Sequence, residues 1–564
     1  MLAMKKCVLY CSRSSVSMTR VMSSSSLSDF KAWNEPMFDY GPGSEERAKL
    51  EAAIKQYDGQ VTDIPIVIGG EEIRTSDVRY QVAPFDHQKK IAKYHYASAD
   101  LVQKAIDSSL KARKEWERKS FDKRAQVFLK AADLVGGTYR MDLLATTMLG
   151  QAKTIFQAEI DAAAELADFY RFNVHFGLEL QKVQPVSPSS EITNKLNFRG
   201  MEGFWAAISP FNFTAIGGHL PVGPAIVGNV SVWKPSDTAM LSNWTVFRVL
   251  REAGLPPGVI NFVPADGPVF GDTVTSSPDL CGINFTGSVR TFRHLWKQVG
   301  QNIDNYKTYP RLIGECGGKN YHLIHSSADA ETVAVATYKA AFEFGGQKCS
   351  ACSRLYIPQS MWPKVKQLML DIHKDVTYGS PLDYKNFLSA VIDEKSFDRI
   401  KGWLDHAKSS PNLTVIAGGD CDKKKGYFVQ PTIVETTDPK DPIMQEEIFG
   451  PILTVYVYPD DKIMDVARLV DSTTVYSLTG SIFSKDRQVT EQLLEVLRDA
   501  AGNVYLNDKC TGSVVGQQPF GGTRLSGTND KAGGPHYLLK FASPQAMKES
   551  KVEQRGWRYP SMDV

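Results

Sequence analysis

The segment FWAAISP (residues 204–210) is the first of four short apolar runs that end in polar or turn-forming residues. The others are VSVWKPS (230–236), INFVPAD (260–266) and GINFTGS (282–288). A helical pattern at 239–254 separates two of them and stops at a glycine followed by two prolines. Short apolar strands that alternate with helices are typical of a parallel sheet with crossover helices. The sequence therefore predicts an α/β fold.

Polar groups follow three of these predicted strands, at Ser209–Asn212, Lys234–Asp237 and Thr286–Ser288. In open parallel sheets, ligands bind beyond the carboxyl ends of the strands. The three strand ends therefore indicate a nucleotide-binding crevice. Neither G-x-G-x-x-G nor G-x-x-x-x-G-K-[ST] occurs in the chain, so a dinucleotide would bind here without the usual glycine pattern.

Length and composition limit the classes of protein to consider. The chain has 564 residues, which is too long for one ordinary domain, and a formal net charge of +2. This balance gives no reason to expect nucleic acid or an anionic membrane as a partner. No apolar stretch is long enough to span a bilayer. Eight irregularly spaced cysteines do not form a disulfide framework, and a reduced compartment is the simpler interpretation.

The N-terminal leader, residues 1–28, has an unusual composition. It contains four basic residues, nine serines and no acidic residue before Asp29. This composition is typical of a mitochondrial transit peptide, and the alternative is a disordered serine-rich tail without a targeting role. We expect import into mitochondria.

Two cysteines, Cys349 and Cys352, form a single C-x-x-C pair. A zinc site needs four ligands, and no second pair is present. The nearest histidines, His322 and His325, lie in an apolar YHLIH run and are interpreted as strand residues. A redox dithiol remains an alternative, although nothing upstream resembles a small thioredoxin-like unit.

A nucleophilic cysteine fits the surrounding sequence better. Lys348 precedes Cys349 and would favour the thiolate, and Gly345–Gly346 would permit the close approach of another group. Glu315, among glycines, and Asn212, at a predicted strand end, are candidate catalytic partners.

The chain resembles the aldehyde dehydrogenase family over essentially all residues after the leader. Cys316 and Arg524 depart from the family's usual leucine and lysine, and neither is part of the expected chemistry. Seven motifs in the family's order carry the resemblance: SPFNFTA (209–215), WKPSD (233–237), FTGS (285–288), GECGGK (314–319), GGQKC (345–349), EEIFGP (446–451) and PFGGTRLSG (519–527).

The resemblance implies an aldehyde dehydrogenase-like fold with three parts. A Rossmann-like NAD-binding domain is expected from residues 29–180 and 204–313, and an α/β catalytic domain from 314–522. Residues 181–203 and 535–564 are expected to form a small oligomerisation hairpin and tail. The resemblance also implies a homodimer or a larger homo-oligomer.

The resemblance also assigns roles to the candidate residues. Cys349 would be the nucleophile, Glu315 the general base for hydrolysis, and Asn212 an oxyanion donor together with the backbone N–H of Cys349. No metal is implied. A carboxylate at Asp237 would favour NAD over NADP by repelling a 2′-phosphate. The implied NAD-binding residues are Ser209, Lys234, Asp237, Gly287, Ser288 and Glu447.

Within the family, the chain most resembles the members that oxidise glutamate semialdehyde. This resemblance rests on FNFTAIGG (211–218), GGQKCSAC (345–352), TGSVVGQQPFGG (511–522) and SGTNDKAGGPHYL (526–538). It implies NAD-dependent oxidation of that aldehyde in the mitochondrial matrix. The alternatives are another aldehyde substrate, release of the product to CoA, a non-catalytic relative, and a thiol oxidoreductase that depends on Cys352. The implied substrate-binding residues are Phe213, Ser350, Gly512, Ser513 and Phe520.

Overall fold

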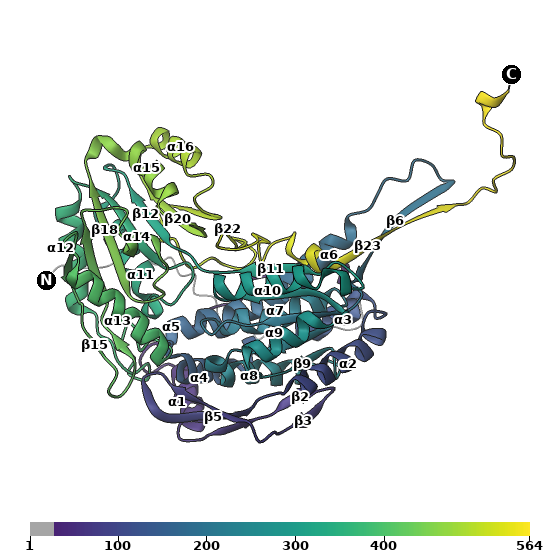
Figure 1. Cartoon of the computed structure of the whole chain (residues 1–564), viewed down its shortest axis with the longest axis horizontal. Helices are drawn as coiled ribbons and strands as arrows, with labels where there is room; N and C mark the ends of the chain where they lie inside the picture. Colours follow the sequence, from purple (N-terminus) through teal and green to yellow (C-terminus); the bar gives the residue numbers. More distant parts are fainter. Residues whose placement is uncertain (1–26, 564) are drawn as a thin grey trace.

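The structure, a computed structural model, describes residues 27–563. The predicted transit peptide (1–28) lies outside the described residues except for its last two. Two seven-stranded sheets form the body of the described chain, and a two-stranded arm projects from it (Figure 1). Between residues 27 and 563, no helix has the length and apolar character that crossing a membrane would require.

The first sheet contains the four apolar runs of the sequence, and these pair in parallel as predicted. In this register Ile208 lies opposite both Lys234 and Phe285, so the three predicted strand ends meet at one edge. The strands, in their spatial order, are β11 (Arg311–Glu315), β10 (Leu280–Thr286), β7 (Phe204–Ile208), β8 (Ser231–Lys234), β9 (Ile260–Phe262), and the antiparallel β2 (Ile66–Ile68) and β3 (Glu71–Ile73).

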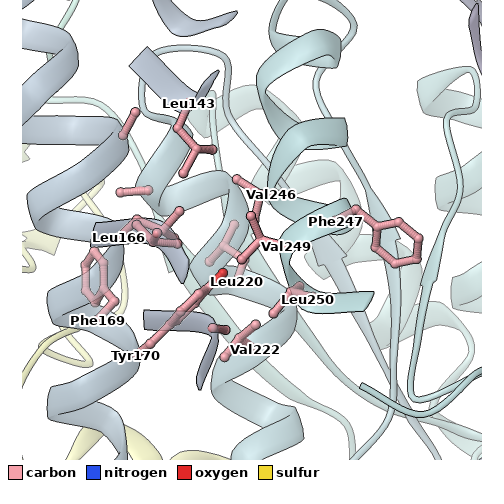
Figure 2. Packing of buried hydrophobic residues seen from close by; sticks show 14 of the residues in the cluster. Leu143, Leu166, Phe169, Tyr170, Leu220, Val222, Val246, Phe247, Val249 and Leu250 are labelled. Atoms are coloured by element: carbon pink, nitrogen blue, oxygen red, sulfur yellow. The ribbon is translucent and has the colours of Figure 1, made fainter. Parts of the chain in front are cut away.

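Helices cover this sheet and carry most of its core. Figure 2 shows buried side chains of α4, α6, α7 and α8 packed against one another, including Leu143, Tyr170, Leu220 and Val246. The helices are α1 (Glu45–Tyr57), α2 (Ala99–Trp116), α3 (Phe121–Gly136), α4 (Arg140–Gln151), α5 (Ile155–Ala158), the π-helix η2 (Glu159–Glu165), α6 (Leu166–Lys182), α7 (Thr214–Ile226), α8 (Met240–Glu252), α9 (Gly267–Ser276) and α10 (Val289–Gln301), with short turns at η1 (Leu27–Asp29), η3 (Asp237–Ala239) and η4 (Ile303–Asn305). A three-stranded sheet of β1 (Thr62–Ile64), β5 (Asp86–His95) and β4 (Val78–Ala83) flanks them.

The second sheet is parallel except at its first strand, β14. Its order is β14 (Leu413–Ala417), β17 (Thr432–Thr436), β18 (Ile452–Tyr458), β13 (Cys352–Pro358), β12 (Asn320–Ile324), β20 (Thr479–Phe483) and β21 (Asn503–Leu506). The associated helices are α11 (Ala330–Phe342), η5 (Glu343–Gly346), α12 (Trp362–Asp375), α13 (Glu394–Ser409), α14 (Pro442–Gln445), η6 (Asp460–Lys462), α15 (Ile463–Ser472) and α16 (Arg487–Val496). Two small ribbons complete it, β15 (Cys421–Asp422) with β16 (Phe428–Val429), and β19 (Tyr476–Ser477) with β22 (Thr523–Arg524).

The chain passes between the two sheets close to the predicted domain boundary at residues 313 and 314. Strand β11 belongs to the first sheet up to Glu315, and β12 starts the second sheet at Asn320. A single bridge joins Glu315 to Gly527, so the returning C-terminal chain lies beside the same crossing. Glu315 therefore lies where the two sheets meet.

The projecting arm joins the two segments expected to serve oligomerisation. Strand β6 (Ile192–Gly200) pairs antiparallel with β23 (Ala542–Ser550) over its full length. The C-terminal tail continues beyond the arm through the short turn η8 (Pro560–Met562) (Figure 1). Just before β23, the turn η7 (Tyr537–Phe541) buries aromatic side chains in the main core, so the last segment begins inside the body of the molecule.

Candidate active site

A left-handed turn places Cys349. Phe344, Gly345 and Gly346 have φ angles of 53°, 61° and 67°. A Cβ atom at residue 346 would lie 2.3 Å from the carbonyl oxygen of Gly450, so only glycine fits there. The predicted close approach at this glycine pair is confirmed at Gly346, whose partner is the backbone of the EEIFGP motif.

The Cys349 thiol opens into a cavity, and its backbone is fixed by Asn320, whose side-chain amide donates to the Cys349 carbonyl at 2.6 Å. Burial, and then the charges of Glu315 and Glu447, raise the pKa of the thiol. Lys348, which was expected to favour the thiolate, pairs its Nζ with the Glu343 carboxylate at 3.0 Å. The thiol therefore needs a base to become a nucleophile.

Asn212 approaches the cysteine turn from the loop between strand β7 and helix α7. Its Nδ2 donates to the carbonyl of Gln347 at 3.1 Å, two residues before the nucleophile. A buried carboxylate, Asp161, accepts the first N–H groups of helix α7, at residues 214 and 215 (2.9 and 2.8 Å), and pairs with Lys153 at 2.7 Å. This ion pair fixes the start of α7 and so the position of Asn212.

Glu315 enters the same cavity from the end of strand β11. Burial, and then the charge of Asp530, raise the pKa of its carboxyl well above its usual range, and Lys531 opposes the rise. Its Oε2 is buried and has no hydrogen-bond partner among residues 27–563. A buried carboxyl group with a raised pKa beside a thiol is suited to accept and return a proton.

All five predicted substrate-binding residues lie in this cavity with Cys349 and Glu315. The hydroxyl groups of Ser350 and Thr511 are 2.7 Å apart and join the cysteine turn to the 511–513 loop. Gly512 has a φ of +90°, which turns the loop towards the cavity. The five residues are Phe213, Ser350, Gly512, Ser513 and Phe520.

All the expected cofactor residues except Glu447 lie at the edge of the first sheet. Lys234 ends strand β8, and Asp237 starts the turn that follows. The Tyr96 hydroxyl donates to Asp237 Oδ2, whereas Oδ1 is buried and lacks a partner within the described residues. A buried carboxylate oxygen without a donor is suited to accept a ribose hydroxyl.

Gly287 and Ser288 form the turn into helix α10. The Ser288 hydroxyl accepts the N–H of Thr291 at 3.2 Å and caps the helix. A Cβ atom at Gly287 would lie 2.7 Å from the Phe285 ring, which keeps this turn narrow. The start of a helix favours phosphate, so this end of α10 fits a pyrophosphate.

Glu447 lies under the crossing between the two sheets. Its Oε1 accepts the backbone N–H of Gly318 at 2.8 Å, and burial raises the pKa of its carboxyl to about 7. The carboxylate of Glu447 packs against Gly317, where no side chain fits, because a Cβ atom at residue 317 would lie 2.1 Å from Oε2. The second sheet thus contributes one carboxylate to the expected NAD site.

Ser209 has a different environment from the other expected cofactor residues. Its hydroxyl donates to the Gly217 carbonyl at 3.0 Å and accepts the indole N–H of Trp233 at 2.7 Å. Both contacts are buried within the protein, so this hydroxyl links helix α7 to strand β8.

The sequence did not single out Glu165 or Cys510, and it interpreted His322 only as a strand residue. Glu165 lines the cavity, and burial together with Asp161 raises the pKa of its carboxyl to about 8. The signal in the sequence that could have pointed to Glu165 is the presence of acidic residues inside the apolar AEIDAAAELADF segment. Cys352 does not form a pair with Cys349: its sulfur lies in a buried cluster with a ring nitrogen of His322 and the sulfur of Cys510.

Fold and site together define a class of cysteine-dependent aldehyde oxidisers. The chain belongs to the aldehyde dehydrogenase family, whose profile matches residues 74–547. It is 60% identical over 537 residues to "Delta-1-pyrroline-5-carboxylate dehydrogenase, mitochondrial" of Homo sapiens, with 95% of each chain covered. A Dictyostelium discoideum protein of the same name is 49% identical over 531 residues, covering 94% of this chain and 95% of that protein.

A solved structure shows the same relationship in three dimensions. The delta-pyrroline-5-carboxylate dehydrogenase from Mycobacterium tuberculosis, bound with NAD, has a TM-score of 0.91 and 42% sequence identity to this chain. The match covers 95% of this chain and 98% of that one. The fold predicted from the sequence is therefore confirmed.

Proposed function

We propose that this chain is an NAD-dependent dehydrogenase that oxidises L-glutamate γ-semialdehyde to L-glutamate in proline degradation. The semialdehyde forms when Δ1-pyrroline-5-carboxylate opens by hydrolysis. The observation that carries the proposal is the single cavity that holds Cys349, Glu315 and the Gly512–Ser513 turn. The names and high identity of the mitochondrial relatives support the same reaction and a mitochondrial location, and we propose the matrix as its site.

Cys349 starts the reaction by attacking the aldehyde carbon. Because burial raises the pKa of this thiol, its proton has to leave before the carbon–sulfur bond forms. Water takes this proton to solvent, so the Glu315 carboxylate stays free for the later hydrolysis. The oxyanion that forms takes hydrogen bonds from Asn212 Nδ2 and the backbone N–H of Cys349. Loss of one such donor costs about 3 kcal/mol of transition-state stabilisation.

NAD, when bound, supplies the acceptor for the hydride that leaves this adduct, so a thioester remains on Cys349. Lys234 and Asp237 would hold the adenosine ribose, Gly287–Ser288 the pyrophosphate, and Glu447 the nicotinamide ribose. The negative charge of Asp237 would repel a 2′-phosphate, which favours NAD over NADP.

Glu315 then completes the turnover. Its carboxylate takes a proton from water, the hydroxide adds to the thioester carbon, and the carbon–sulfur bond breaks. Glutamate leaves as the carboxylic acid product, and the sulfur of Cys349 regains a proton. A carboxyl group with a raised pKa in an enclosed cavity is suited to this exchange.

The substrate carries an α-carboxylate and an ammonium group far from its aldehyde, and a buried carboxylate needs donors. The backbone N–H groups at Gly512 and Ser513 and the Ser513 hydroxyl would receive it. Phe213 and Phe520 would pack on the methylene chain and set its length, and Ser350 adds a further hydroxyl group. The arm formed by β6 and β23 would join subunits into a homodimer or a larger assembly.

NADH production against a panel of aldehydes tests the reaction. With Δ1-pyrroline-5-carboxylate, NAD and no CoA, one glutamate should form for each NADH. A requirement for CoA would instead indicate an acylating enzyme. A higher kcat/KM for an uncharged aldehyde of similar length would contradict the proposed substrate.

A further inference from the structure

Three side chains from separate segments converge in the interior of the second sheet's domain. They are His322 in strand β12, Cys352 at the start of strand β13, and Cys510, which follows strand β21. One ring nitrogen and the two sulfur atoms all lie within 4.8 Å of one another. Their exposed fractions are 0%, 1% and 0%, so solvent does not separate them.

The histidine ring is held in one orientation. Its Nε2 lies 3.1 Å from the backbone N–H of Cys510 and accepts that hydrogen. In a neutral ring Nδ1 then carries the proton, and it donates to the Thr337 hydroxyl at 2.9 Å. The Nε2 lone pair therefore faces the cysteine segment. A second hydrogen bond from the far ring nitrogen is the usual support of a metal-binding histidine.

The two sulfur atoms have no strong competing partners. The Cys510 thiol makes a 3.4 Å contact with the carbonyl of Ser350, and the Cys352 thiol a 3.5 Å contact with that of Arg354. Thiols are weak donors, so little is lost when these contacts break. With Zn–S bonds of about 2.3 Å, tetrahedral sulfur ligands lie about 3.8 Å apart, so the three atoms have to close by up to about 1 Å.

We propose that His322, Cys352 and Cys510 supply three ligands to a thiophilic cation of the Zn²⁺ class, with a water molecule as the fourth ligand. Binding joins the cation to the two sulfur atoms and to Nε2, and the two thiol protons pass to solvent. Two thiolates and a neutral imidazole cancel the charge of a divalent cation, which suits a buried site. The backbone N–H of Cys510 gives up its histidine acceptor.

Both cysteines connect directly to the catalytic cavity. Cys352 lies three residues after the nucleophile, and Cys510 is followed by Thr511, whose hydroxyl is 2.7 Å from that of Ser350. Closing the ligands around a cation draws the cysteine turn and the 511–513 loop together. A bound cation therefore reversibly lowers kcat/KM for the semialdehyde, a consequence that rests on the proposed function.

Metal titration of a Cys349→Ala variant tests the site independently of activity, because that variant lacks the catalytic thiol as a competing ligand. Added Cd²⁺ should give a sulfur-to-cadmium charge-transfer absorption that saturates at one ion per chain, and Zn²⁺ should displace it. Cys349→Ala/Cys510→Ser and Cys349→Ala/His322→Gln should each weaken binding at least 100-fold.

Cys349→Ala/Cys281→Ser is the matched control, since Cys281 is also fully buried but lies outside the cluster, and it should bind as the parent does. Circular dichroism identifies any variant that fails to fold. If one ligand variant is unfolded, the Cd²⁺ affinity of the other ligand variant tests the site. Unchanged Cd²⁺ affinity in the folded ligand variants, or no charge-transfer band in the Cys349→Ala protein, would overturn the proposal.

Discussion

Gly317→Ala should weaken NAD binding while the fold stays intact. Gly317 lies at the crossing between the sheets, and the new Cβ would lie 2.1 Å from Glu447 Oε2 and 2.4 Å from its carboxyl carbon. Non-bonded carbon and oxygen atoms need about 3.5 Å, so the carboxylate has to retreat by more than about 1 Å. That movement breaks its 2.8 Å bond to the Gly318 N–H and removes it from the expected position of the nicotinamide ribose.

A hydrogen bond to a charged group contributes about 1.5–3 kcal/mol, which corresponds to an increase of about 10- to 100-fold in the Kd for NAD. The lost contact with Gly318 affects the NAD-free and the NAD-bound protein alike, so it does not contribute to the change in the Kd for NAD. Quenching of tryptophan fluorescence by NAD measures the Kd, and thermal unfolding checks the fold.

Gly271→Ala is the matched control. Gly271 lies inside helix α9, and a Cβ atom there meets its nearest neighbour, Leu295, at an ordinary 3.5 Å. This variant should bind NAD as the unmodified protein does. An unchanged Kd in folded Gly317→Ala would refute the assignment of Glu447 to the cofactor.

Three further predictions concern the cavity. Cys349→Ala should abolish NADH formation and still bind NAD, whereas Cys352→Ala should keep most of its activity in metal-free buffer, and equal losses would revive a dithiol mechanism. Asp530→Asn removes a like charge and should lower the pKa of Glu315. Thioester hydrolysis speeds up as Glu315 loses its proton, so its rate should reach a plateau at lower pH in single-turnover profiles. A shift of this plateau to higher pH would contradict the prediction. Ser513→Ala should raise KM for glutamate semialdehyde about 10-fold or more, with little change for an uncharged aldehyde of similar length, and equal effects on both would exclude the anchoring role.

The strand ends were predictable because parallel pairing brings equivalent ends to one edge. Ser209, Lys234 and Ser288 follow apolar runs of the sequence, and the register places those runs side by side. Local sequence could not show which hydroxyl groups stay free. The Ser209 hydroxyl is taken by Gly217 and Trp233, a tertiary contact that no periodicity reveals.

The remaining features of the site depend on contacts between segments that are distant in the sequence, which the sequence pattern does not show. The C-x-x-C spacing left a dithiol with Cys349 open as an alternative, and it could not show that the side chain of Cys352 lies beside His322 and Cys510. Lys348 was expected to act on its neighbour in sequence, yet a buried Glu343 five residues earlier pairs with it. Glu165 faces the cavity from a π-helix, and an apolar pattern predicts only that such a segment is buried.

The covalent intermediate tests the central claim most directly. Glu315→Gln protein, mixed with Δ1-pyrroline-5-carboxylate and NAD, should release at most one NADH per chain and then stall. Mass spectrometry of the digested protein should find the mass added by a glutamate γ-thioester on the peptide that contains Cys349. Rapid turnover by this variant, or an unmodified Cys349 after NADH has formed, would contradict the account.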